Sequence, residues 1–155
     1  MEDLFDHIRN GDLQAVKKRL QEKPALKAKR DRRGSTPLIL AAYYNQAEIV
    51  EFLLQGGVEV DEKDASGNTA LMGVCFKGYQ EVARKLIEAG ADVNTRNAMG
   101  GTCLIFAITF NREDIAKLLI KHGADINAKD ARGQTALDHA RMQGLHSLIN
   151  LLENQ

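Results

Sequence analysis

The residues best suited to chemistry in this 155-residue chain are its four histidines and two cysteines. His139 and His146 can share one face of a helix, but no His-Glu-x-x-His or Cys-x-x-Cys motif accompanies them, as such zinc sites would need. Cys75 and His139 have the residue types of a nucleophile and its base, yet Cys75 falls at a position that repeats as a small core residue. We therefore expect no catalytic residues, no metal site and no cofactor.

The motifs that hold phosphate or build a strained nucleophile are also missing. The sequence contains no G-x-x-x-x-G-K-[ST], no G-x-G-x-x-G and no G-x-S-x-G. Acidic pairs such as Glu113 with Asp114 fall at expected helix starts, where carboxylates complement the helix dipole. The sequence predicts a protein that is not an enzyme.

Composition is that of a globular protein, with 44% hydrophobic and 27% charged residues. Lysine plus arginine (21) balances aspartate plus glutamate (21), so no net charge favours nucleic acid or anionic lipid. No apolar run approaches the roughly 18 residues of a membrane span, and the acidic start MEDLFDHIRN is unlike a signal peptide. The two cysteines suit a reducing compartment. We expect a monomeric, cytoplasmic protein without a membrane partner.

The sequence repeats every 33 residues, and this repeat sets the order of the helices that would position any site. Four glycines lie 33 residues apart, and a threonine follows each by two positions: Gly34, Gly67, Gly100 and Gly133, with Thr36, Thr69, Thr102 and Thr135. Apolar positions recur in the same register, among them Leu38, Leu71, Leu104 and Leu137. Residues 2–30 fit the pattern once one extra loop residue is allowed. The sequence predicts five stacked units.

Each unit has the pattern of two short helices. Threonine is a good N-cap for the first helix, and Pro37 suits its first turn. The second helix carries one apolar stripe, and a glycine that favours the left-handed conformation ends it. In one unit the apolar stripe consists of Ile49, Val50, Leu53 and Leu54. The glycines that end the second helices are Gly56-Gly57, Gly90 and Gly123.

The units read DRRGSTPLILAAYYNQAEIVEFLLQGGVEV, DASGNTALMGVCFKGYQEVARKLIEAGADVN, NAMGGTCLIFAITFNREDIAKLLIKHGADIN and DARGQTALDHARMQGLHSLINLLENQ. This pattern resembles the ankyrin repeat family. The resemblance implies an all-α solenoid of helix-turn-helix units joined by β-turn or hairpin-like loops. We expect one domain, 1–155, with cap repeats at 2–33 and 133–155 and internal repeats at 34–66, 67–99 and 100–132.

Two departures from the family pattern are evident. The histidine that follows Thr-Pro-Leu in the family is replaced by Ile39, Met72, Ile105 and Asp138, so packing must stabilise that turn instead. Polar Arg141 and Glu153 occupy columns that are apolar in earlier units. We interpret these two residues as marks of a terminal repeat.

The resemblance also implies a protein partner bound at the concave face, which the hairpin tips and first helices form. Four of the eight aromatic residues fall in two adjacent columns of this face, and interfaces are enriched in such side chains. The alternative is that the rings pack within their own repeats. The predicted partner-binding residues are Tyr43, Tyr44, Phe76, Lys77, Phe110, Met142, Phe106 and Leu40, with the tips Arg32, Arg33, Met99 and Arg132.

A basic segment from Lys17 to Arg33 holds nine cations against Glu22 and Asp31. Three interpretations stay open: a solvated capping surface, an acidic protein partner, or nucleic acid. No aromatic residue lies within the segment, which disfavours binding of single-stranded nucleic acid by stacking.

A second functional hypothesis is a dedicated accessory or inhibitor of one enzyme. The stretch Met72 to Gly78 and the five-repeat layout look like small free-standing bacterial ankyrin proteins, some of which accompany oxidative-stress enzymes. The main hypothesis remains a non-enzymatic scaffold that binds a partner protein.

Overall fold

Ten α-helices follow one another in five pairs along residues 3–155, the part of the chain that the computed structural model describes. A 3-10 helix, η1 (Pro24–Ala28), follows the first pair. We number the repeats one to five by their pairs: α1 (Leu4–Arg9) with α2 (Leu13–Glu22), α3 (Pro37–Tyr43) with α4 (Ala47–Gln55), α5 (Ala70–Lys77) with α6 (Gln80–Glu88), α7 (Cys103–Thr109) with α8 (Glu113–Lys121), and α9 (Ala136–Gln143) with α10 (His146–Glu153).

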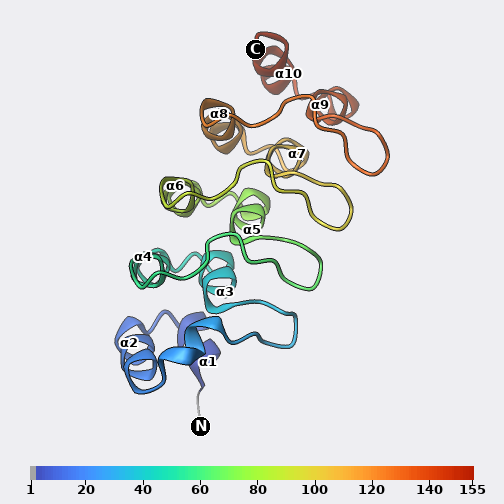
Figure 1. The fold of residues 1–155 in the computed structure, drawn as a ribbon. Coiled ribbons are helices and arrows are strands. Elements are labelled where there is room, and N and C mark those ends of the chain that lie inside the picture. Colours follow the sequence, from blue (N-terminus) through green and yellow to red (C-terminus); the bar gives the residue numbers. More distant parts are fainter. Residues whose placement is uncertain (1–2) are drawn as a thin grey trace.

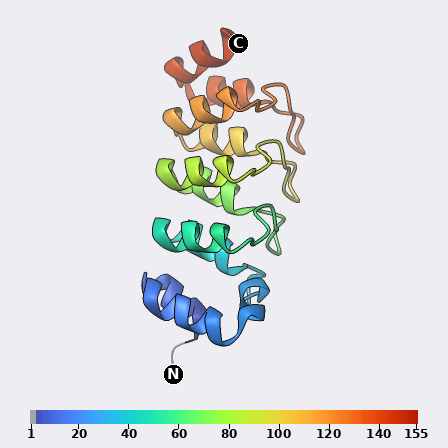
Figure 2. The ribbon, with the colours of Figure 1, turned by 60° about the vertical axis from the view of Figure 1, so that its left-hand side comes forward.

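The helix pairs stack into a solenoid (Figure 1). The first helices of the pairs form one column, the second helices form another, and the hairpin loops project on the side away from the second helices. Figure 2 shows the same order from the side, with each pair lying on the one before it. The predicted all-α solenoid is therefore confirmed. Glu2, where the first cap repeat was expected to begin, lies outside the described residues.

The threonine of each hairpin begins the first helix, as the sequence predicts. The hydroxyls of Thr36, Thr69, Thr102 and Thr135 accept from the backbone N–H three residues later, at 3.2 to 3.3 Å. Such a cap satisfies one of the free amides of the first turn and contributes about 1 kcal/mol. The same contact in four repeats fixes where each first helix starts.

The turn that lacks the family's histidine is stabilised in two ways. Ile39, Met72 and Ile105 are buried, as the packing hypothesis expects. Asp138 instead accepts from the backbone N–H of Thr135 at 2.9 Å and completes a reciprocal capping box. This hydrogen bond holds the pKa of the Asp138 carboxyl below its usual value. The last repeat thus replaces apolar packing with a polar cap.

The second helices of three repeats are followed by left-handed glycines, as predicted. Gly57, Gly90 and Gly123 have φ of +80°, +96° and +90°. In the pair Gly56-Gly57, Gly56 is the right-handed C-cap and only Gly57 is left-handed. A Cβ would be strained in this conformation, which explains the recurrence of glycine here.

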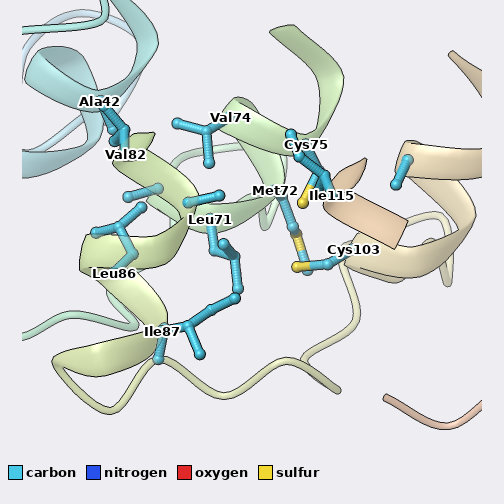
Figure 3. Packing of buried hydrophobic residues seen from close by; sticks show 14 of the residues in the cluster. Ala42, Leu71, Met72, Val74, Cys75, Val82, Leu86, Ile87, Cys103 and Ile115 are labelled. Atoms are coloured by element: carbon cyan, nitrogen blue, oxygen red, sulfur yellow. The ribbon is translucent and has the colours of Figure 1, made fainter. Parts of the chain in front are cut away.

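The core runs between the two columns of helices along the whole stack. Small side chains such as Ala42 and Cys75 are fully buried, so neighbouring first helices pack closely. In Figure 3, Cys75 and Cys103 lie among Leu71, Val74 and other apolar side chains. Both cysteines are free thiols, and burial raises the pKa of Cys75 well above its usual value. Cys75 is therefore a core residue rather than an activated nucleophile.

Candidate functional site

Five large hydrophobic side chains are exposed among residues 3–155, and all five belong to the predicted partner-binding set. They are Tyr43 (38% exposed), Tyr44 (44%), Met99 (69%), Phe110 (39%) and Met142 (66%). Four of them lie in or directly after the first helices, and Met99 lies at a hairpin tip. We call the surface formed by the first helices and the hairpins the concave face. Isolated exposed apolar residues are common on protein surfaces, whereas these five all lie on one face.

A groove of about 890 Å³ lies in the N-terminal half of the concave face. Leu40 is only 7% exposed and forms part of its floor, together with half-buried Phe76 and Phe106. Tyr43 and Tyr44 line the same groove. The predicted residues therefore take different places: Leu40 shapes the groove from below, and the tyrosines stand exposed within it.

The phenylalanines contact one another across repeats rather than within one repeat alone. Phe76 of α5 meets Phe110 edge to face, with ring centroids 4.5 Å apart. Phe106 and Phe110 stack at 6.5 Å within repeat four. On the second repeat, Tyr43 and Tyr44 lie 6.1 Å apart, and the Lys77 ammonium lies 5.0 Å from the centre of the Tyr43 ring. These contacts hold the rings in place while leaving part of their surface exposed.

Hydrogen bonds close each hairpin tip with its own side chain and link each of the first three tips to the next one. Asp31 accepts from the backbone N–H groups of Arg33 and Ser35, both at 2.9 Å. The N–H of Ala65 then donates to the carbonyl of Arg33 at 3.2 Å, and the later hairpins repeat this link. The predicted tip residues, which are Arg32, Arg33, Met99 and Arg132, are therefore exposed on an ordered support.

The basic segment divides into cations that stabilise the fold and cations that do not. Arg30 donates to the carbonyls of Gly34 and Lys63, both at 2.6 Å, and pairs with Glu62. Lys27 donates to the carbonyl of Gly56 at 3.3 Å. These two residues join the first repeat to the second. The exposed side chains of Lys29, Arg32 and Arg33 make no hydrogen bond or ion pair within residues 3–155.

Two polar contacts near the concave face were missed by the sequence reasoning. The His139 side chain is 16% exposed, and its Nε2 lies 2.8 Å from the Asp130 carboxylate. Backbone N–H donation from Gln134, and to a lesser extent His139, lowers the Asp130 pKa. Arg112 donates to the carbonyl of Phe76 at 3.1 and 3.3 Å, across a sequence separation of 36 residues. No sequence motif signals either contact.

The described part of the chain contains neither a cluster of metal ligands nor a helix that could span a membrane. No group of three or more His, Cys, Asp or Glu side chains lies close enough to hold a metal ion there. The longest described helix, α2, has 10 residues, and none of the described helices has the length and apolarity of a bilayer span.

Comparison with known proteins agrees with the repeat architecture. A family model for ankyrin repeats in three copies matches residues 4–97, more than half of the chain. A second model, for ankyrin repeats in many copies, matches residues 86–140. The comparison with curated proteins gives no match. The threonine-capped first helices, the stacked helix pairs and these two family matches agree with one another. We conclude that the chain belongs to the ankyrin repeat family.

Proposed function

We propose that this protein is a non-enzymatic scaffold that binds a partner protein or peptide through its concave face. Ankyrin repeats generally mediate protein–protein interaction. The observation that carries the proposal for this chain is that every exposed large hydrophobic side chain among residues 3–155 lies on that face. A cytoplasmic location stays a prediction, in keeping with two free cysteines.

Preorganisation of the concave face favours binding of a partner. The tyrosines and phenylalanines are held by ring contacts, and the hairpin tips are held by hydrogen bonds between neighbouring repeats. A partner therefore orders few side chains on binding, which lowers the entropic cost of association. A standard interface of roughly 1,600 Å² in total would extend beyond the groove to the exposed Phe110 and Met142.

The test compares two surface variants in affinity capture from the lysate of the native host. The concave variant combines Tyr44→Ala with Phe110→Ala, and each truncation should weaken partner binding by about 2 kcal/mol. The control variant carries Glu48→Ala, Arg84→Ala and Lys117→Ala, three exposed positions on the second helices. We expect specific partners to be kept by the control and lost from the concave variant, with helical circular dichroism unchanged in both. Equal capture by the two variants would contradict the proposal.

The role of accessory or inhibitor of one enzyme is a narrower form of the same proposal. It requires the same concave contacts with a single enzyme as the partner. If the captured proteins consist of one enzyme whose activity changes on binding, the narrower form is supported, and a mixed set of partners favours the general scaffold.

A further inference from the structure

The concave groove is electrostatically uneven along the stack. The first hairpin tip carries two arginines, Arg32 and Arg33. The positions that correspond to Arg32 in the later tips are Ala65, Ala98 and Ala131, and those that correspond to Arg33 are Ser66, Met99 and Arg132. Two adjacent arginines thus occur only in the first of the four tips.

The cations at this end have no partner of their own. Arg32, Arg33 and Lys29 line the groove, are exposed, and make no ion pair within residues 3–155. Two other cations of the groove are already paired, Arg9 with Asp6 at 3.2 Å and Arg30 with Glu62. Three cationic side chains at this end of the groove therefore have no ion-pair partner within residues 3–155.

Within residues 3–155 the carboxylates that line the groove form no ion pair with these three cations, and they accept from backbone N–H groups of their own turns instead. Asp3 accepts from the N–H of Asp6 at 3.0 Å. Asp31 and Asp64 each accept from two N–H groups within their hairpins, at 2.9 Å. An external anion is then the partner that the free cations lack.

Next to the cations lies an apolar floor with two further donors. Tyr43 and Tyr44 are exposed, and their hydroxyls have no hydrogen-bond partner within residues 3–155. Leu40, Met72 and Phe76 line the groove beyond them. A ligand that fits this arrangement has carboxylates at one end and apolar side chains at the other.

From this charge complementarity we propose that the groove binds an acidic segment of a partner protein, with its carboxylates on Lys29, Arg32 and Arg33 and an adjacent apolar side chain on the floor. The inference rests on the proposed function and adds the chemistry of the partner. A nucleic acid fits less well, because the phenylalanine cluster beyond the groove carries no row of cations. Affinity for a nucleic acid comes largely from cations that contact several phosphates along the backbone.

The probe is a library of random peptides of roughly 12 residues, which span about 40 Å when extended. The library is selected on the full-length protein, and the best peptide is then synthesised for fluorescence anisotropy. We expect enrichment of aspartate and glutamate beside an aromatic or aliphatic residue. Binding should weaken about tenfold between roughly 50 mM and 300 mM NaCl, because exposed charges are screened.

The decisive comparison uses charge reversal at two ends of the same face. Arg32→Glu with Arg33→Glu should weaken peptide binding by about tenfold or more, because two attractive contacts become repulsive. Arg132→Glu, an exposed arginine at the position of Arg33 in the last tip, should change it less than about twofold. All three side chains are exposed, so both variants should keep the wild-type circular dichroism and melting temperature.

The outcomes separate the inference from the proposed function. A selected peptide whose binding is lost in the Tyr44→Ala, Phe110→Ala variant but which is not acidic would overturn the inference alone. Equal sensitivity to Arg132→Glu, or displacement of the peptide by an oligothymidine at similar concentration, would overturn it too. A selection that yields no binder, or only binders indifferent to Tyr44→Ala with Phe110→Ala, would count against the proposed function itself.

Discussion

Repeats four and five share one backbone plan, but within residues 3–155 only repeat four has another repeat packed on its C-terminal side. Ile108 of α7, the helix that contacts α9, is fully buried, whereas Arg141, at the same position of α9, is exposed. Arg141 pairs with Glu153 at 3.1 Å, so the two polar substitutions of repeat five contact each other. The polarity of these columns therefore follows from whether another repeat packs on them, rather than from local helix propensity.

The same contrast is present in the hairpins. Gly100 has φ of +76°, and a Cβ there would lie 2.8 Å from the backbone nitrogen of Ala131 in the next tip. Gly133 has nearly the same φ, +77°, but a Cβ there would meet nothing within 4 Å. Gly100 is needed both for its left-handed conformation and for the close approach of the next tip, whereas Gly133 is needed for its conformation only.

The largest effect on stability is expected at Leu104, and it can be compared with Leu137, which has the same position in repeat five. Leu104 is 1% exposed, so Leu104→Ala should leave a cavity and lower the free energy of unfolding by about 3 kcal/mol. Leu137 is half-buried in the last repeat, and Leu137→Ala should lower it by only about 1 kcal/mol. Urea unfolding followed by circular dichroism measures both. Equal losses would show that the last repeat is packed as tightly as the fourth.

A smaller difference is expected between the two hairpin glycines. Gly133→Ala should lower the free energy of unfolding by about 1 kcal/mol, the cost of a left-handed alanine. Gly100→Ala should lower it by about 2 kcal/mol, because the backbone of the next tip must also move. Thermal unfolding of the two variants gives the comparison. If both lose the same stability, the link between tips contributes nothing of its own.

The smallest effect on stability is expected from Asp130, the acidic residue of the hairpin before α9. Asp130 has a lowered pKa, so its carboxylate stabilises the fold above the ordinary value of 3.8, and this contribution is lost as pH falls through the folded-state pKa. Asp130→Asn should remove that part of the acid sensitivity, giving a shallower fall in stability from about pH 5 to about pH 2. Asn97 makes the same two turn bonds in repeat four, at 3.0 and 2.8 Å, so an amide fits. An unchanged pH profile would argue against this assignment.

The exposed part of the candidate site was predictable because the columns are periodic. Once Tyr44 and Phe110 fall in the same column, the repeat plan puts both on one face, and their exposed fractions of 44% and 39% fit that placement. Leu40, which shares another column with Phe106, was included in the same predicted set and is instead nearly buried. Exposure within a column depends on the neighbouring side chains, and the period does not describe these.

The sequence by itself determined the architecture of this protein: the helix caps, the glycine turns, the order of the stack and its polar end. It could do so because each repeat packs only on its neighbours, so a local pattern fixes the whole. Tertiary structure alone decided which polar side chains are used within the fold. Within residues 3–155, Arg30 and His139 have side-chain partners, whereas the side chains of Arg32 and Arg33 have none. Burial tolerates small displacements, but a hydrogen bond requires donor and acceptor at about 3 Å and in line, and only the assembled stack sets that geometry.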